Sequence, residues 1–255
     1  MQKIKTNQIL IFTLSVLLLS SAISYLAYNA DNLNISFLAV FTPSLVALIL
    51  TVVNNGKNGA KSLFISQLTK RFDFKWLFFA MLLFPFLGGL AIIIHNLFGG
   101  PELSLRTTQL FPQLIVILLI SLGEEFGWRG FLQPKLQKHV SVLTASLIVG
   151  SVWAIWHYPA ALIGTGVPQD MSFFTFAIWV LLASIVIGWL YNKTGSVLIA
   201  IIMHSMANIT FNYLPLLPEF TNQITTFYIF MICVAVLTVP FLPAINRKSV
   251  DVFSK

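Results

Sequence analysis

Residues 114–130 read Leu114-Ile-Val-Ile-Leu-Leu-Ile-Ser-Leu-Gly-Glu-Glu-Phe-Gly-Trp-Arg-Gly130, an apolar run that ends in charged residues. Glu124 and Glu125 are adjacent in this run, and Arg129 follows one helical turn later. One charge at the centre of a bilayer costs about 2.5 kcal/mol or more, so carboxylates inside a membrane usually mark a functional site. The structural alternative is an ion pair of Glu125 with Arg129, at i and i+4, at the end of a helix.

The composition of the whole chain indicates a membrane protein. Its 255 residues are 57% hydrophobic and 9% charged, with a mean hydropathy of +0.87, whereas about a quarter of the residues in a soluble domain are charged. A spanning helix needs about 20 mostly apolar residues. We therefore predict an all-α fold, a polytopic transmembrane helical bundle that forms one membrane domain over residues 1–255. About eight spans are expected: Ile9–Tyr28, Ile35–Val53, Trp76–Phe98, Leu110–Phe131, Val142–Ala161, Phe173–Tyr191, Val197–Leu214 and Phe227–Ile245.

The positive charges predict how the chain is oriented. The net charge is +7, and every Lys and Arg except Arg106 falls on one side of the membrane if the spans alternate. Because Lys and Arg are enriched in cytoplasmic loops, both termini are expected in the cytoplasm, and the small, positive-inside chain suits the plasma membrane of a bacterium. This distribution argues against a nucleic-acid partner. The single cysteine, Cys233, excludes an internal disulfide and a cysteine-rich metal site.

Two later spans also carry polar side chains. His157 is alone in an apolar run, where it could simply bond a neighbouring carbonyl, and Trp153 precedes it by four residues on the same helix face. His204 and Asn208 are likewise four residues apart, and either could join helices by a hydrogen bond. Together with the paired carboxylates, these groups form a set suited to activating water and holding an oxyanion.

The motifs E-E-x-x-x-R, aromatic-x-x-x-H and H-x-x-x-N, in this order on separate helices, resemble those of the CPBP family. This family comprises the CAAX-prenyl-protease and bacteriocin-processing (Abi) intramembrane proteases. The match covers roughly residues 110–214, and Arg129-Gly-Phe-Leu-Gln133 also fits the usual continuation, while Trp153 stands where Phe is commoner. The resemblance implies a helical bundle whose active site opens within the membrane. The matching positions are Glu124, Glu125, Arg129, His157, His204 and Asn208.

The resemblance also implies a role for each residue. Glu124 would activate a water as general base, and His157 would position or deprotonate that water. His204 and Asn208 would donate hydrogen bonds to the oxyanion of a tetrahedral intermediate. Glu125, Arg129 and Trp153 would be supporting structural residues. Arg129 would hold Glu125 in place.

A zinc site is the competing interpretation. Glu124, His157 and His204 match a zinc-hydrolase ligand set that leaves a fourth position for water. No H-E-x-x-H pair is present to hold zinc from one helix, which favours a metal-independent, glutamate-type protease over a metalloprotease. The cofactor is left open between a divalent metal such as zinc and none.

The expected depth of His157 in the membrane does not match that of the other candidate site residues. At about 1.5 Å per residue, Glu124 and His204 reach similar depths, but His157 lies roughly 22 Å from a cytoplasmic helix start at Val142 and therefore nearer the outside. A tilted helix, or one that begins deeper near Ala145, would bring it to the other residues.

The predicted function is an intramembrane endopeptidase. Its substrate would be a membrane-associated peptide or protein, such as a leader, quorum-sensing or bacteriocin-type precursor, and its other partner is the lipid bilayer. Two alternatives stay open: a non-catalytic immunity or regulatory scaffold, and a cation-coupled transporter that uses Glu124 and the histidines as a relay. The sequence does not predict the oligomeric state.

Overall fold

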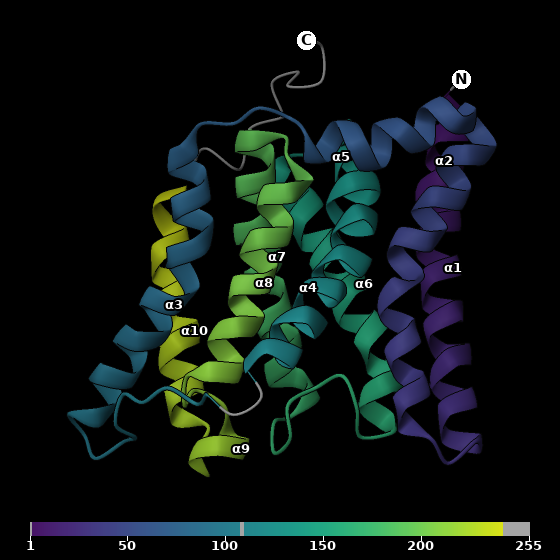
Figure 1. The fold of residues 1–255 in the computed structure, drawn as a ribbon. Coiled ribbons are helices and arrows are strands. Elements are labelled where there is room, and N and C mark those ends of the chain that lie inside the picture. The colour runs from purple at the N-terminus through teal and green to yellow at the C-terminus, as the bar shows by residue number, and fades with distance from the viewer. Residues whose placement is uncertain (1, 108–109, 242–255) are drawn as a thin grey trace.

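The computed structural model describes residues 2–107 and 110–241, which contain helices and connections but no strand. The elements, shown in Figure 1, are in chain order α1 (Gln2–Asn29), the 3-10 helix η1 (Leu33–Phe41), α2 (Thr42–Lys61), the π-helix η2 (Ser62–Ser66), α3 (Phe74–Asn96), α4 (Leu110–Gly127), the π-helix η3 (Trp128–Leu132), α5 (Gln133–Leu136), α6 (Val142–Leu162), α7 (Phe173–Thr194), α8 (Val197–Tyr213), α9 (Pro218–Thr221), α10 (Thr225–Thr238) and the 3-10 helix η4 (Val239–Phe241). The predicted all-α bundle is confirmed.

Six helical stretches in the described part of the chain are long and apolar enough to cross a membrane: Asn7–Asn29, Leu33–Ser66, Phe74–Asn96, Val142–Leu162, Phe173–Thr194 and Val197–Thr221. The other two predicted spans are also helical. The fourth comprises α4 and continues into η3. The eighth corresponds to α10, which has only 14 residues, and the last part of this predicted span, residues 242–245, lies outside the described residues.

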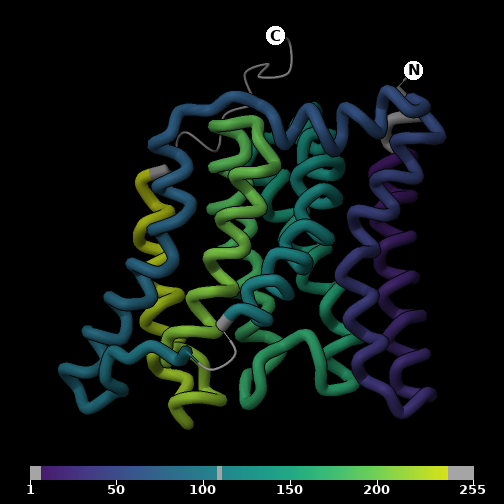
Figure 2. The backbone as a smooth tube through the Cα atoms, in the orientation of Figure 1, coloured from purple at the N-terminus to yellow at the C-terminus, as the bar shows by residue number. Residues whose placement is uncertain are grey.

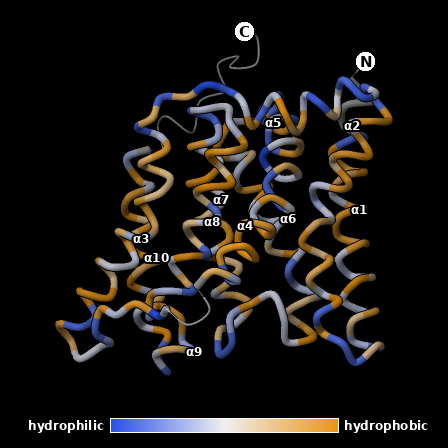
Figure 3. The backbone as a smooth tube through the Cα atoms, in the orientation of Figure 1, coloured by the Kyte–Doolittle hydropathy of each residue, from blue (hydrophilic) through white to orange (hydrophobic). Residues whose placement is uncertain are grey.

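The long helices alternate in direction between two ends of the bundle (Figure 1). One end, called here the basic end, contains the α2–α3 connection, α5 and the α7–α8 turn. The opposite end contains η1, the α6–α7 connection and α9 (Figures 1 and 2). Hydrophilic residues concentrate at these ends and hydrophobic residues between them (Figure 3). The basic end carries Lys57, Lys61, Lys70, Arg71, Lys75, Lys135, Lys138 and Lys193.

Small residues set how closely α4 approaches its neighbours. A Cβ at Gly127 would lie 2.4 Å from Cβ of Pro43 and 2.5 Å from its carbonyl carbon, and a Cβ at Gly123 would lie 2.8 Å from the carbonyl oxygen of Val40. Glycine therefore lets the backbone of α4 pack directly on η1 and on the start of α2. This contact fixes the depth and rotation of the helix that carries both carboxylates.

The helix α2 is broken near the basic end by Gly56, whose φ of 62° is a left-handed conformation that favours glycine. Beyond this break, residues 57–66 run across the basic end instead of continuing the span (Figure 2). We call residues 57–66 the interfacial segment. Its Leu63 is buried, and the adjoining Gln67 donates a 3.1 Å hydrogen bond from Nε2 to the carbonyl of Gly130. The segment is thereby tied to η3.

Candidate active site

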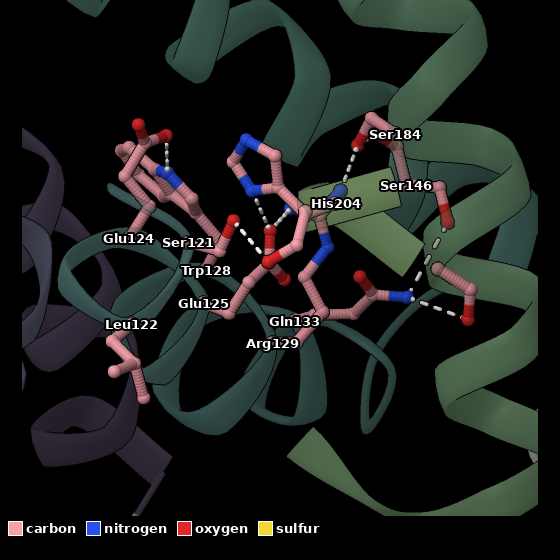
Figure 4. A network of polar contacts seen from close by, with 12 residues as sticks. Ser121, Leu122, Glu124, Glu125, Trp128, Arg129, Gln133, Ser146, Ser184 and His204 are labelled. Carbon is pink, nitrogen blue, oxygen red and sulfur yellow. Dashed lines mark hydrogen bonds and ion pairs between the residues drawn. The ribbon is translucent and has the colours of Figure 1, made fainter. Parts of the chain in front are cut away.

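Glu125 is the centre of a buried polar cluster between α4, η3 and α8 (Figure 4). Its Oε1 accepts a 2.8 Å hydrogen bond from Nη1 of Arg129 and lies 2.8 Å from Nδ1 of His204. The side chains of Glu125 and Arg129 are both fully buried. The ion pair predicted from the i, i+4 spacing is therefore present. The contact with His204 joins residues 79 positions apart, and the sequence did not predict it.

The segment that carries Arg129 is a π-helix, a form that frequently occurs at functional sites. Nη2 of Arg129 donates to Oγ of Ser184 on α7 at 3.3 Å, and Ser184 in turn donates to the carbonyl of Ser146 on α6 at 2.8 Å. Nε2 of Gln133 donates a 3.3 Å hydrogen bond to Oγ of Ser146. Sequence reasoning missed Ser184 and Ser146, because single serines in apolar helices are too common to be a signal.

Glu124 points away from this cluster, as expected for adjacent residues that differ by about 100° around a helix. Its Oε2 accepts a 3.3 Å hydrogen bond from Nε1 of Trp128, which is four residues later on the same helix face (Figure 4). The side chain is 2% exposed and lines a large cavity. The two carboxylates are therefore divided as the spacing predicts: Glu125 is paired, while Glu124 faces a space that a ligand can enter.

The cavity has a volume of about 560 Å³, and Glu124, His157, His204 and Asn208 all line it. The four residues that the motifs group together thus line one cavity, and their assignment to an active site and their chemical roles stay predictions. From Glu124 the cavity runs to the opposite end of the bundle, where its lining includes Asn34 of η1. Further lining groups at that end include Thr165, Gly166, Pro168, Asn212 and Glu219.

His157 is held by its own helix. Its Nδ1 lies 2.9 Å from the carbonyl oxygen of Trp153, which can only accept, so Nδ1 carries the hydrogen. The other nitrogen, Nε2, then keeps the lone pair of the neutral ring. The nearest aromatic walls of His157 are Trp156 and Phe176, with centroids at 4.7 and 4.9 Å.

Trp153 shares a helix face with His157, but its ring lies closer to other groups of the site. Its ring centroid is 6.1 Å from that of His157 and 5.1 Å from that of His204. The guanidinium of Arg129 lies 5.0 Å from the same centroid. Trp153 therefore packs between the Glu125 cluster and the cavity.

The depth difficulty for His157 is resolved by the shape of the cavity. Helix α6 begins at Val142, so a deeper start at Ala145 is not the explanation. Instead the cavity extends along the bundle and reaches both Glu124 and the level of His157. A Cβ on Gly166, in the α6–α7 connection, would lie 3.9 Å from Cδ2 of His157, which places this ring close to the opposite end.

The three residues of the zinc interpretation line one cavity but do not form a ligand set. Within residues 2–107 and 110–241, no group of three or more His, Cys, Asp or Glu side chains is arranged so that it could hold a metal ion. Nδ1 of both histidines is directed at the protein, to a carbonyl and to Glu125 respectively, so only Nε2 of each ring would be available to a metal. The arrangement of Glu124, His157 and His204 does not fit zinc coordination.

Comparisons with known proteins agree with the motifs. A model of the type II CAAX prenyl endopeptidase Rce1-like family matches residues 106–210, which include every motif residue of the candidate site. The CAAX prenyl protease 2 of Methanococcus maripaludis is 28% identical over 236 residues, which cover 84% of this chain and 86% of the relative. The second similarity extends beyond the motif-bearing helices to most of the bundle.

Proposed function

Because the chain is a protease of the CPBP family, we propose that it hydrolyses a peptide bond of a membrane-associated peptide with a water activated by Glu124. One observation carries this proposal: a carboxylate, two imidazoles and a carboxamide from three helices line a single cavity. Beside them, the second carboxylate is neutralised by Arg129. A packing role needs neither the cavity nor this division between the two carboxylates.

The first step is attack by water on the scissile carbonyl. Oε2 of Glu124 accepts from Trp128, so Oε1 is the oxygen left to take a proton from water. The lone pair on Nε2 of His157 can accept the second hydrogen of the same water and orient it. The water oxygen bonds to the carbonyl carbon, and the π electrons of the carbonyl move to its oxygen, which gives a tetrahedral oxyanion.

The oxyanion needs hydrogen-bond donors. His204 and Asn208, one turn apart on α8, are placed to supply them. Nδ1 of His204 is directed at Glu125, so the ring donates from Nε2 only if both nitrogens carry hydrogen. The formal charges of Glu124, Glu125, Arg129 and a doubly protonated His204 sum to zero. Such neutrality is what a water-excluded site requires. Glu124 then returns its proton to the leaving nitrogen as the C–N bond breaks, which yields an amine and a carboxylic acid. The acid then transfers its proton to the released amine.

The cavity lining bears on the substrate. It is largely apolar and aromatic, and no Lys or Arg is among the described residues that line it. A substrate held by its free C-terminal carboxylate would lack a strong cationic partner there. We therefore favour cleavage of an internal bond in a leader, quorum-sensing or bacteriocin-type precursor. The name of the archaeal relative, a CAAX prenyl protease, makes a prenylated peptide the second candidate.

We place the basic end in the cytoplasm and the protein in the plasma membrane of a bacterium, because Lys and Arg mark cytoplasmic loops. The cavity then extends from Glu124 toward the outer face. A peptide would enter from the bilayer or from that face, which suits precursors that are processed during export.

The test compares wild type with Glu124→Gln in liposomes on unmodified leader-type and prenylated peptides. Gln keeps the size of the side chain and an oxygen that accepts from Trp128, so the melting temperature should be unchanged. Cleavage should fall by at least about 100-fold, the contribution typical of general-base catalysis. Equal cleavage by both proteins would exclude Glu124 as the base. Absence of cleavage of every peptide by wild type would instead favour the scaffold or transporter alternative.

A further inference from the structure

A second polar region lies at the basic end, behind the candidate active site. Two cavities adjoin there, with volumes of about 180 and 220 Å³, and Asn55, Lys135 and Lys138 line both. The smaller one lies between α2, the interfacial segment and η3, and includes Ser62 and Gly130. The larger one also includes Gln8 of α1 and His139. We call the two together the basic cleft.

The charge of the basic cleft has one sign. Two lysines and a histidine line it, and no Asp or Glu is among its described lining residues. The neutral lining groups include amides and hydroxyls that can donate hydrogen bonds. Lys135 is half-buried, and its ammonium lies 4.3 Å from the ring centroid of Phe131, so its stem is held by packing. This lining suits an anion with several acceptor oxygens.

The position of the basic cleft at the ends of the spanning helices indicates which anion it would meet. It lies where the spanning helices end and where Lys57 and Lys61 of the interfacial segment are exposed. At this level of a bilayer the abundant anions are lipid phosphates, and basic pockets between transmembrane helices bind such headgroups. Of the apolar residues beside the lysines, Leu63 and Phe131 are buried, and the half-buried Pro134 offers a contact for the start of a lipid chain.

We propose that the basic cleft binds the phosphate of an anionic phospholipid headgroup, with Lys135 and Lys138 as its cationic ligands. The occupant would also lie against Gly130, the residue after Arg129 and the one whose carbonyl is held by Gln67. A bound headgroup therefore braces η3 between the interfacial segment and α5. Through η3 it stabilises the position of Arg129, and hence the Glu125–His204 contact.

The experiment measures lipid binding and stability without relying on activity. The full chain is reconstituted in phosphatidylcholine with and without phosphatidylglycerol. The lipid retained after mild detergent extraction is counted by native mass spectrometry, and the melting temperature is recorded. The test variant is Lys135→Gln/Lys138→Gln. The matched control, Lys57→Gln/Lys61→Gln, removes the same formal charge from the same end but outside the described lining of the cleft.

Wild type and the control should retain phosphatidylglycerol and melt higher in its presence. The test variant should bind it on the order of 100-fold more weakly, the effect of losing two hydrogen bonds to a charged phosphate. Equal losses of phosphatidylglycerol binding in the test and control variants would show general electrostatic attraction and overturn the proposed site. No loss of binding in either variant would also overturn it. Stabilisation of wild type by inorganic phosphate alone, equal to that by phosphatidylglycerol, would overturn the assignment to a lipid.

A folding defect is excluded by two further measurements. The test variant should melt at the wild-type temperature in pure phosphatidylcholine. The single change Lys138→Gln, at an exposed position, should lose part of the phosphatidylglycerol effect with the fold intact. Unchanged lipid retention in this single variant and in the double variant would refute the proposal.

Discussion

Replacing Arg129 with alanine should destabilise the protein strongly, because its partner Glu125 is fully buried. The change removes the 2.8 Å ion pair and leaves the carboxylate without its main counter-charge. Breaking a buried pair from one side costs about 3–5 kcal/mol. For a protein of this length that corresponds to a melting temperature lower by roughly 6–20 °C. Arg129→Lys keeps the charge and loses mainly the hydrogen bond to Ser184, so it should cost about 1 kcal/mol, or roughly 2–4 °C.

The double-mutant cycle identifies the cause. Glu125→Gln removes the carboxylate charge but keeps an oxygen that can accept from Nδ1 of His204. Added to Arg129→Ala, it should recover stability, with a coupling energy of about 1–3 kcal/mol. The assay is thermal unfolding in detergent micelles, with surface expression as a second readout. Additive losses in the double variant, or equal stability of Arg129→Ala and wild type, would refute the buried pair and make Glu125 the rival candidate for the base.

Three further results are expected. Gly127→Ala should separate α4 from α2 and lower both stability and activity, since its Cβ would lie 2.4 Å from Cβ of Pro43. The control is Gly89→Ala, because nothing lies within 4 Å of a Cβ at that position. Equal effects of the two changes would contradict the packing argument. Chelators should leave peptide cleavage unchanged, since the described side chains form no three-ligand metal group; a loss that zinc restores would reverse this conclusion. Single cysteines at the exposed positions Asn58 and Gln169 should react with impermeant reagents from opposite sides of the membrane, and labelling of both from one side would overturn the topology.

The predictable part of the site consists of contacts within one helix. Glu125 pairs with Arg129 because a helix places residues i and i+4 on one face, whatever surrounds it. The same geometry sends Glu124 in another direction. It also explains the bond from His157 to the carbonyl four residues earlier, which the sequence left as one alternative. The donor from Trp128 to Glu124 follows the same spacing and could have been predicted.

The contacts between helices could not be obtained in this way. The hydrogen bonds of Glu125 to His204, and of Arg129 to Ser184, join residues 79 and 55 positions apart. They depend on the rotation and depth of each helix, and these depend on close packing at particular points, such as Gly127 on Pro43.

The sequence by itself determined the helical bundle, the basic end and the identity of the motif residues. Apolar length and the expense of membrane charges leave few alternatives for these features. Only the tertiary structure decided that one cavity reaches both Glu124 and His157, which counting along the helices places at different depths. It also decided that His204 bonds to Glu125, and that Lys135 of α5 and Lys138 beyond it meet the interfacial segment in a cleft. The physical reason is that periodicity along one helix carries no information about its neighbours, whereas a cavity is the space that several packed helices leave between them.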